Sequence, residues 1–208
     1  MRGRFIVFEG LDGSGISTQA RRLASNLDAQ DVHYFMTREP TDGPIGSQIR
    51  LALAKRLAFD PVTLALMFAA DRSDHIHAVI APRMNAGIHV LCERYVLSSL
   101  SYQGAATGDV DWIRSINGPN LGRLMPDLIL FFDVPPGTAL ERIDAARHAR
   151  ELFEEVETLA LTRQAFFNSI EWLRERGCRV EVIDATAPIA TVTGLVSKLI
   201  AECIDSGS

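Results

Sequence analysis

The sequence predicts an α/β fold in which a five-stranded parallel sheet is flanked by helices. Two observations carry this prediction: short apolar runs alternate with longer helical stretches along the 208 residues, and most of these runs are continuous. A continuous apolar run is typical of a strand covered on both faces, and repeated strand–helix units form parallel sheets with right-handed crossovers. The length suits one substantial core, so we expect a single domain over residues 1–208.

The elements follow one another in a regular order. The expected strands are Arg4–Glu9, Val32–Thr37, Ile88–Glu93, Leu128–Val134 and Arg179–Asp184. The expected helical stretches include Thr18–Leu27, Pro61–Asn85, Val96–Ala106, Thr138–Ala146, Ala149–Arg176 and Ile189–Ile204. Sheets of this kind bind ligands at the carboxyl ends of their strands. The residues that follow each strand are therefore the first candidates for function.

Composition excludes several classes of protein. The net charge of -5 disfavours a nucleic-acid-binding surface, which needs clustered positive charge. No apolar run reaches the roughly 20 residues of a membrane span, and the N-terminal run leads straight into a motif instead of a signal peptide. We therefore expect a cytoplasmic protein that binds neither nucleic acid nor membranes. Cys92, Cys178 and Cys203 lack metal-ligand spacing, so we expect reduced, structural cysteines.

The first expected strand runs into FEGLDGSGISTQ, which has the form of a phosphate-binding loop, G-x-x-x-x-G-K-S/T, at all but one position. The expected phosphate-binding residues are Gly10, Leu11, Asp12, Gly13, Ser14, Gly15, Ile16, Ser17 and Thr18. A loop between a strand and a helix fits this motif better than a chance glycine-rich turn. Its glycines let successive N–H groups face phosphate oxygens, and the helix start adds a positive dipole end. Ser17 holds the position whose hydroxyl binds Mg²⁺.

Ile16 stands where the motif has lysine. A lysine would follow the charge that develops on the transferred phosphoryl group, whereas isoleucine supplies neither charge nor donor. Removing one preorganised donor from comparable sites lowers the rate about a hundred- to a thousandfold. Nucleotide binding should suffer less, because the backbone amides and the metal are retained. Lys55 and Lys198 are the only lysines, so compensation would have to come from arginine.

The chain resembles the thymidylate kinase family over nearly its whole length. Four further segments match family motifs in the right order: TREPT, FAADRSDHI, ERYVLSSLSYQG and DAT. The resemblance implies a P-loop NTPase fold of the nucleoside monophosphate kinase type, in a homodimer. It implies phosphorylation of dTMP to dTDP with ATP as co-substrate and Mg²⁺ as cofactor. It also places Thr186 and Ala187, which follow the last strand, against adenine.

The resemblance assigns roles around the acceptor phosphate. Arg38 matches the arginine that grips this phosphate, and Arg94 matches one that approaches the phosphates. Asp12 matches an acidic position that contacts the 3′-hydroxyl of the sugar and helps to set the reacting geometry. Glu93 replaces the more usual aspartate and is expected to orient water around Mg²⁺. Asp12 and Arg94 are therefore candidate catalytic residues.

The acceptor base has its own candidates. Phe68 and Arg72 lie four residues apart, hence on one helical face, where a ring can stack on a pyrimidine and a guanidinium can donate to its 4-oxo group. In the family match, Ser99 offers a polar group to the pyrimidine edge. Tyr102 lies beside the sugar, and Gln103 completes the segment. All five residues are expected to bind substrate.

A segment of about residues 140–155 aligns with the mobile lid of the family. It contains Arg142, Arg147 and Arg150, any of which could stabilise transferred charge as an arginine finger does. Gly13 follows Asp12, where one subgroup of the family has an arginine, so the chain resembles the subgroup whose catalytic arginine lies in the lid. We rank Arg147 first, Arg150 second and Arg142 third. The segment lacks a clear copy of the lid pattern.

Two other functions stay open at the level of sequence. Ile16, Glu93 and the irregular lid also fit a non-catalytic nucleotide-binding or regulatory protein of the same fold. A kinase for a modified pyrimidine monophosphate fits as well, because one or two pocket residues decide which substituent is accepted. Turnover with dTMP discriminates against the first alternative, and a panel of pyrimidine nucleotides against the second.

Overall fold

The computed structural model describes residues 2–143 and 149–206, and for residues 149–155 it describes the backbone alone. The strands are β1 (Phe5–Gly10), β2 (Tyr34–Arg38), β3 (His89–Glu93), β4 (Leu128–Asp133) and β5 (Val180–Asp184). They form one five-stranded sheet in the order β2-β3-β1-β4-β5, in which every neighbouring pair is parallel. The predicted fold class is confirmed, and each strand lies within about one residue or two of its expected range.

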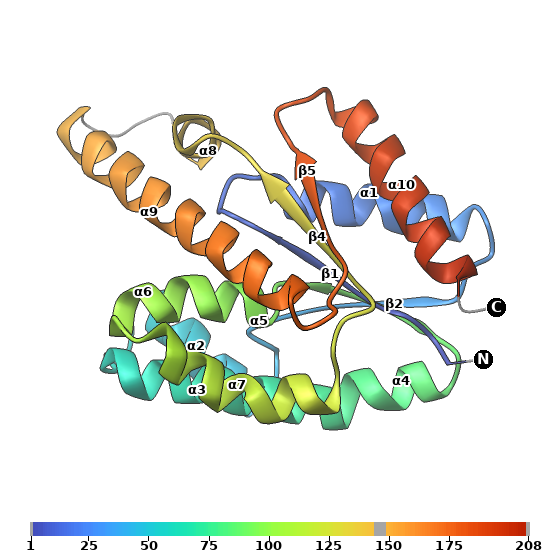
Figure 1. Ribbon diagram of the computed structural model, residues 1–208, viewed down its shortest axis with the longest axis horizontal. Coiled ribbons are helices and arrows are strands. Elements are labelled where there is room, and N and C mark those ends of the chain that lie inside the picture. The colour runs from blue at the N-terminus through green and yellow to red at the C-terminus, as the bar shows by residue number, and fades with distance from the viewer. Residues whose placement is uncertain (1, 144–148, 207–208) are drawn as a thin grey trace.

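Ten α-helices surround the sheet in the described part of the chain. They are α1 (Ile16–Asp28), α2 (Pro44–Leu53), α3 (Pro61–His75), α4 (Ala81–Asn85), α5 (Val96–Ser98), α6 (Gly104–Thr107), α7 (Val110–Arg123), α8 (Pro136–Ile143), α9 (Ala149–Arg174) and α10 (Ile189–Asp205). Two π-helical segments, η1 (Ile76–Ile80) and η2 (Ser99–Gln103), join α3 to α4 and α5 to α6. Helices α1 and α10 lie on one side of the sheet, and α3, α4, α5 and α7 lie on the other (Figure 1).

The covering helices explain why the strands read as continuous apolar runs. All six residues of β1 are buried, and five of the six in β4. The rings of Phe8 and Phe132 stack across the sheet, and Phe5 packs edge-on against Tyr95. β2 lies at the edge of the sheet and is only half-buried. The core thus holds β1 rigidly, and β1 carries the phosphate loop at its carboxyl end.

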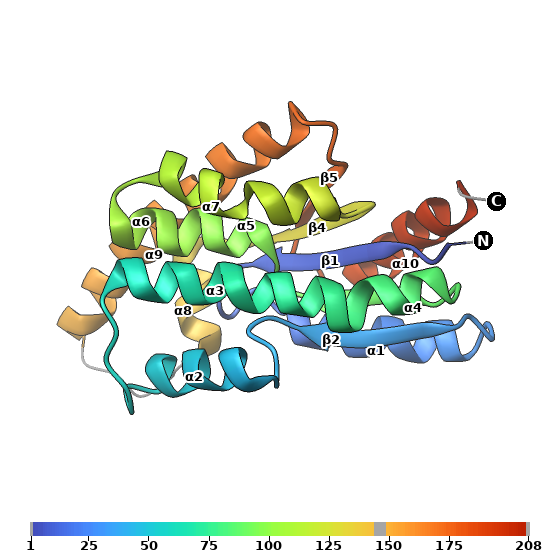
Figure 2. The same cartoon turned by 90° about the horizontal axis from the view of Figure 1, so that it is seen from below.

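Helices α2 and α7 were not among the expected helices. The sequence of α7 contains Gly118, Pro119 and Gly122, which all disfavour a helix interior. Tertiary contacts overcome this preference: the amide of Asn120 donates to the Ala69 carbonyl of α3 at 2.9 Å. Figure 2 shows α7 running beside α3 along this side of the molecule. A segment such as α7 becomes a helix through packing rather than through propensity.

None of the described helices is both long and apolar enough to cross a bilayer.

Candidate active site

The phosphate loop joins β1 to α1 at the carboxyl edge of the sheet. Gly13 and Gly15 have φ angles of 79° and 93°, a left-handed conformation that favours glycine. Gly15 caps α1 without a side-chain hydrogen bond. Among the described residues, the N–H groups of Gly13, Gly15, Ile16 and Ser17 have no acceptor. The loop therefore presents free donors at a helix start, an arrangement that suits phosphate oxygens.

Gly13 is constrained by its neighbour as well as by its backbone. A Cβ at Gly13 would lie 2.3 Å from the Ala139 carbonyl oxygen of α8, whereas a Cβ at Gly15 would meet nothing within 4 Å. We expect Gly13→Ala and Gly15→Ala each to lose about 1–2 kcal/mol of unfolding free energy through the left-handed backbone. Gly13→Ala should lose more, and it alone should move the loop and weaken ATP binding about tenfold or further.

Urea unfolding and ATP calorimetry on both variants measure these effects. Gly137→Ala is the control, because its Cβ meets nothing within 4 Å and lies in helix α8, where alanine is favoured. Equal ATP affinities for Gly13→Ala and Gly15→Ala would contradict a loop that is packed against α8.

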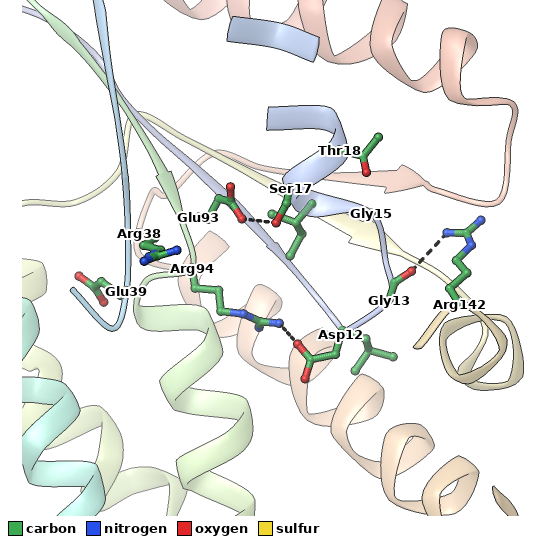
Figure 3. Close-up of a pocket in the computed structure, with 12 residues that line it drawn as sticks. Asp12, Gly13, Gly15, Ser17, Thr18, Arg38, Glu39, Glu93, Arg94 and Arg142 are labelled. Carbon is green, nitrogen blue, oxygen red and sulfur yellow. Dashed lines mark hydrogen bonds and ion pairs between the residues drawn. The ribbon is translucent and has the colours of Figure 1, made fainter. Parts of the chain in front are cut away.

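A cavity of about 480 Å³ opens over the loop (Figure 3). Besides the loop itself, its lining includes Arg38, Glu39, Glu93, Arg94 and Arg142. Ile16 also lines it, but its side chain is only 7% exposed and belongs to the hydrophobic core. In the described part of the chain, every cation of this cavity is thus an arginine.

Of the three arginines expected in a lid, the structure places Arg142 at the loop. Its Nη2 donates to the Ala185 carbonyl at 3.1 Å, and its Nη1 lies 3.5 Å from the Gly13 carbonyl oxygen (Figure 3). Arg147 lies outside the described residues, and Arg150 belongs to α9 with its side chain outside them. The residue ranked third from the sequence is therefore the one found beside the phosphate loop.

Ser17 and Glu93, the two candidate metal-site residues, meet in this cavity. The Ser17 hydroxyl donates to Oε2 of Glu93 at 2.5 Å, so the longer carboxylate reaches from β3 to the start of α1 (Figure 3). The part of the chain that the structure describes contains no cluster of three or more His, Cys, Asp or Glu side chains suited to a metal. A hydroxyl and a carboxylate are the hard oxygen donors that Mg²⁺ takes, with phosphates and water completing its shell. The pair fits Mg²⁺ carried with a nucleotide.

Arg94 follows β3 in a left-handed conformation, with φ of 65°. A non-glycine residue held in this way is strained and is found disproportionately at functional sites. Its Nη1 donates to the Gly10 carbonyl at 3.1 Å and to the Ser98 hydroxyl at 3.0 Å, and its Nη2 pairs with Asp12. The turn therefore directs the guanidinium back at the phosphate loop.

Electrostatics keep Arg94 charged in this place. Burial acts to lower its pKa, but the nearby oxygens of Tyr102, Asp12 and Glu9 outweigh burial and raise the pKa above its ordinary value. Its guanidinium carbon lies 5.4 Å from the centre of the Tyr102 ring. The cation is thus fixed in position, with 24% of its side chain still exposed to the cavity.

A buried carboxylate supports the turn that carries Arg94. Glu9 accepts from the backbone N–H groups of Tyr95 at 2.8 Å and Ser98 at 3.1 Å, and from the Ser98 hydroxyl. Burial raises the pKa of Glu9 above its ordinary value, although these hydrogen bonds act against the rise. Sequence reasoning did not select this residue. The available signal was a carboxylate inside an otherwise apolar strand.

Arg38 ends β2 and is exposed at the mouth of the cavity. Its Nη2 donates to Asp42 at 3.0 Å, and this hydrogen bond, with the charge of Arg38, lowers the pKa of the Asp42 carboxyl. Both side chains are open to solvent, so the pair is a weak one. Arg38 is therefore free to exchange Asp42 for a phosphate.

A second cavity of about 280 Å³ adjoins the first and shares Asp12, Glu39 and Arg94 with it. All the candidates for binding the acceptor base and sugar line this second cavity: Phe68, Arg72, Ser99, Tyr102 and Gln103. Ser98 and Tyr95, which sequence reasoning did not select, line it as well. The two cavities thus meet at the Asp12–Arg94 pair.

Arg72 is held more tightly than the sequence suggested. Its side chain is 1% exposed, and it forms an ion pair with Glu39 at 2.7 Å. It also donates to the Ser99 hydroxyl at 3.0 Å and to the Asn117 carboxamide oxygen. Sequence reasoning missed Glu39 and Asn117, because Glu39 reads as part of a turn and Asn117 lies on the unexpected helix α7.

A third cavity, of about 190 Å³, lies on the other side of the loop. Ala187 lines it, together with Ala185, Gln19 and Arg142. Thr186 is not part of this lining: its N–H and hydroxyl both donate to Asp184, at 2.9 and 2.6 Å. Of the two residues expected beside adenine, the structure brings only Ala187 to this cavity.

The model of the family described as thymidylate kinase matches residues 8–195. The chain belongs to the thymidylate kinase family. A "Thymidylate kinase" of Symbiobacterium thermophilum is 38% identical, over 96% of this chain and 94% of its own length. Similar proteins with the same name occur in Afipia carboxidovorans, at 39% identity over 92% and 86%, and Thermomicrobium roseum, at 37% identity over 98% and 97%. The resemblance inferred from the motifs is confirmed.

Proposed function

We propose that the protein phosphorylates dTMP to dTDP with Mg²⁺ and ATP, more slowly than it would with a loop lysine. The proposed protein consists of a single kinase domain with a lid at about residues 140–155. Its proposed location is the cytoplasm. One observation carries the proposal: the cavity over the phosphate loop adjoins a second cavity with aromatic and guanidinium groups, and the two share Asp12 and Arg94. A donor triphosphate and an acceptor monophosphate can therefore meet end to end.

In the proposed reaction, an oxygen of the acceptor phosphate attacks the γ-phosphorus of ATP, and the bond to the bridging oxygen of ADP breaks. Catalysis of this step consists mainly of positioning and charge stabilisation. Arg94 lies where both phosphates converge, and Arg38 can grip the acceptor phosphate with its fork. Asp12 fixes Arg94 and can accept from the 3′-hydroxyl of the sugar. Bound Mg²⁺, held at Ser17 and Glu93, would neutralise charge on the phosphates of ATP.

A coupled assay of ADP release with dTMP tests the proposal. Turnover no faster than in a blank without enzyme would contradict the proposed kinase activity. The buried Ile16 favours a second candidate, a nucleotide-binding protein without catalysis. ATP binding by calorimetry, without turnover until Ile16→Lys is introduced, would support that candidate instead.

The acceptor base should be read by its 4-oxo group. Arg72 can only donate, whereas cytosine carries an amine at this position, so two donors would face each other. We expect kcat/KM for dCMP to be about ten- to a hundredfold below that for dUMP, since an unpaired buried donor costs about 1–3 kcal/mol. Steady-state kinetics measure both, and dUMP is the matched control because it keeps the 4-oxo group. A 5-substituted analogue that outperforms dTMP would indicate a kinase for a modified pyrimidine.

The proposal includes a homodimer. Six large apolar side chains are exposed along residues 51–66 of α2, α3 and the segment between them: Leu51, Leu53, Leu57, Phe59, Val62 and Leu66. Exposed apolar side chains that gather on a surface are typical of an interaction site. Sedimentation equilibrium measures the mass in solution, and a species of one 22.9 kDa chain would contradict the dimer.

A further inference from the structure

A row of polar side chains leads from the half-buried Thr37 of β2 to the buried Arg72. Oγ1 of Thr37 lies 2.7 Å from Nε2 of His75, and Nδ1 of His75 lies 3.1 Å from Oε1 of Glu39. The other oxygen of Glu39 accepts from Nε of Arg72 at 2.9 Å. His75 and Arg72 are each 1% exposed and Glu39 is 5% exposed. Neither Thr37 nor His75 lines the cavity assigned to the acceptor base.

Hydrogen bonds link each member of the row to the next. A carboxylate can only accept, so Nδ1 of His75 carries the proton that faces Glu39. Nε2 of His75 lies within hydrogen-bond distance of the Thr37 hydroxyl, which can either donate or accept. Thr37 therefore orients His75, and His75 orients Glu39. Buried polar groups satisfied in this way are rigid, because each rotation would leave a partner unpaired.

Glu39 in turn occupies part of the hydrogen-bond donors of the Arg72 guanidinium. A guanidinium has five N–H groups, of which Nε carries one and the two terminal nitrogens carry two each. Nε donates to Glu39, and Nη2 faces both Glu39 at 2.7 Å and Ser99 at 3.0 Å. Nη1 donates to Asn117. Three of the five N–H groups of Arg72 thus donate hydrogen bonds to described residues, and the ion pair with Glu39 fixes the orientation of the guanidinium.

We propose that Thr37 and His75 are positioning residues for recognition of the acceptor base. Acting through Glu39, they hold Arg72 in the orientation from which it can donate to the 4-oxo group of a pyrimidine. Discrimination against a 4-amino pyrimidine is thus set partly from β2, outside the cavity. The inference rests on the proposed function, because it takes the second cavity as the site of a pyrimidine monophosphate.

Calorimetry of dTMP, dCMP and ATP binding to the full chain tests the inference without requiring turnover. Thr37→Val keeps the shape of the side chain but removes the hydroxyl, and Thr37→Ser keeps the hydroxyl. His75→Leu removes both ring nitrogens, whereas the amide of His75→Asn can still donate to Glu39. We expect Thr37→Val to weaken dTMP binding about threefold to tenfold, and His75→Leu tenfold or more. The ratio of dTMP to dCMP affinity should fall in both, with ATP affinity within about twofold of the unmodified protein.

The two conservative variants show whether the lost hydrogen bonds cause the effect. Thr37→Ser and His75→Asn should recover most of the dTMP affinity and of the base discrimination. Parallel loss of ATP and dTMP affinity in Thr37→Val, or unchanged dTMP affinity, would overturn the positioning role. If His75→Leu does not fold, the comparison of Thr37→Val with Thr37→Ser is sufficient to test the inference. An unmodified protein that binds dTMP without turning it over would refute the proposed kinase activity but leave the inference to be judged by these affinities.

Discussion

Replacing Ile16 by lysine is expected to raise kcat for dTMP about a hundred- to a thousandfold. Ile16 is the first residue of α1, between the loop amides and Ser17, and it lines the cavity over the loop. A lysine stem can follow the apolar path of the isoleucine while its ammonium reaches into the cavity. There it would stabilise charge that develops on the phosphoryl group, an effect worth about 3–4 kcal/mol in comparable sites.

Ile16→Met is the matched control for this gain, because methionine extends the side chain without adding charge. We expect its kcat to stay within a few fold of the unmodified protein, and the KM for ATP to change little in either variant. Steady-state kinetics of the three proteins, side by side, give the comparison. Equal kcat values for Ile16→Lys and Ile16→Met would show that Arg94 and the lid arginines already supply the missing charge.

Arg94→Ala is expected to lower kcat by about three orders of magnitude. Arg94 is shared by the donor and acceptor cavities, and Asp12, Gly10 and Ser98 fix its guanidinium. Losing an arginine that stabilises a phosphoryl transition state costs about 10³–10⁵ in rate. The cost should fall on kcat more than on the KM for ATP, since the loop amides that hold ATP are unchanged.

Two further variants separate charge from geometry at this position. Arg94→Lys keeps the charge but loses the planar fork, so we expect it to recover little of the lost rate. Arg94→Gly relieves the left-handed backbone, so its free energy of unfolding in urea should exceed that of Arg94→Ala by about 1 kcal/mol. Its activity should be as low as that of Arg94→Ala. Retention of more than a tenth of kcat by Arg94→Ala would rule out a central role.

Much of the site follows from the sequence because strand ends are predictable. The phosphate loop, Arg38 and Arg94 each come directly after an expected strand, and a parallel sheet brings those ends to one edge. Positions of positive φ are also visible in the local sequence, because steric clashes disfavour other residues there and glycine is found instead. The family motifs then supply the expected roles, and the structure gathers the candidates for the acceptor base and sugar around one cavity.

The sequence by itself determined the five strands, most of the longer helices and the loop between β1 and α1, because hydrophobic periodicity and backbone sterics act over a few residues. Only the tertiary structure decided which side chains pair. Ser17 and Glu93 are 76 residues apart, and Asp12 and Arg94 are 82 apart. Asn117 reaches Arg72 from a helix whose glycines and proline oppose it. Such partners depend on packing between distant segments, and no local pattern encodes them.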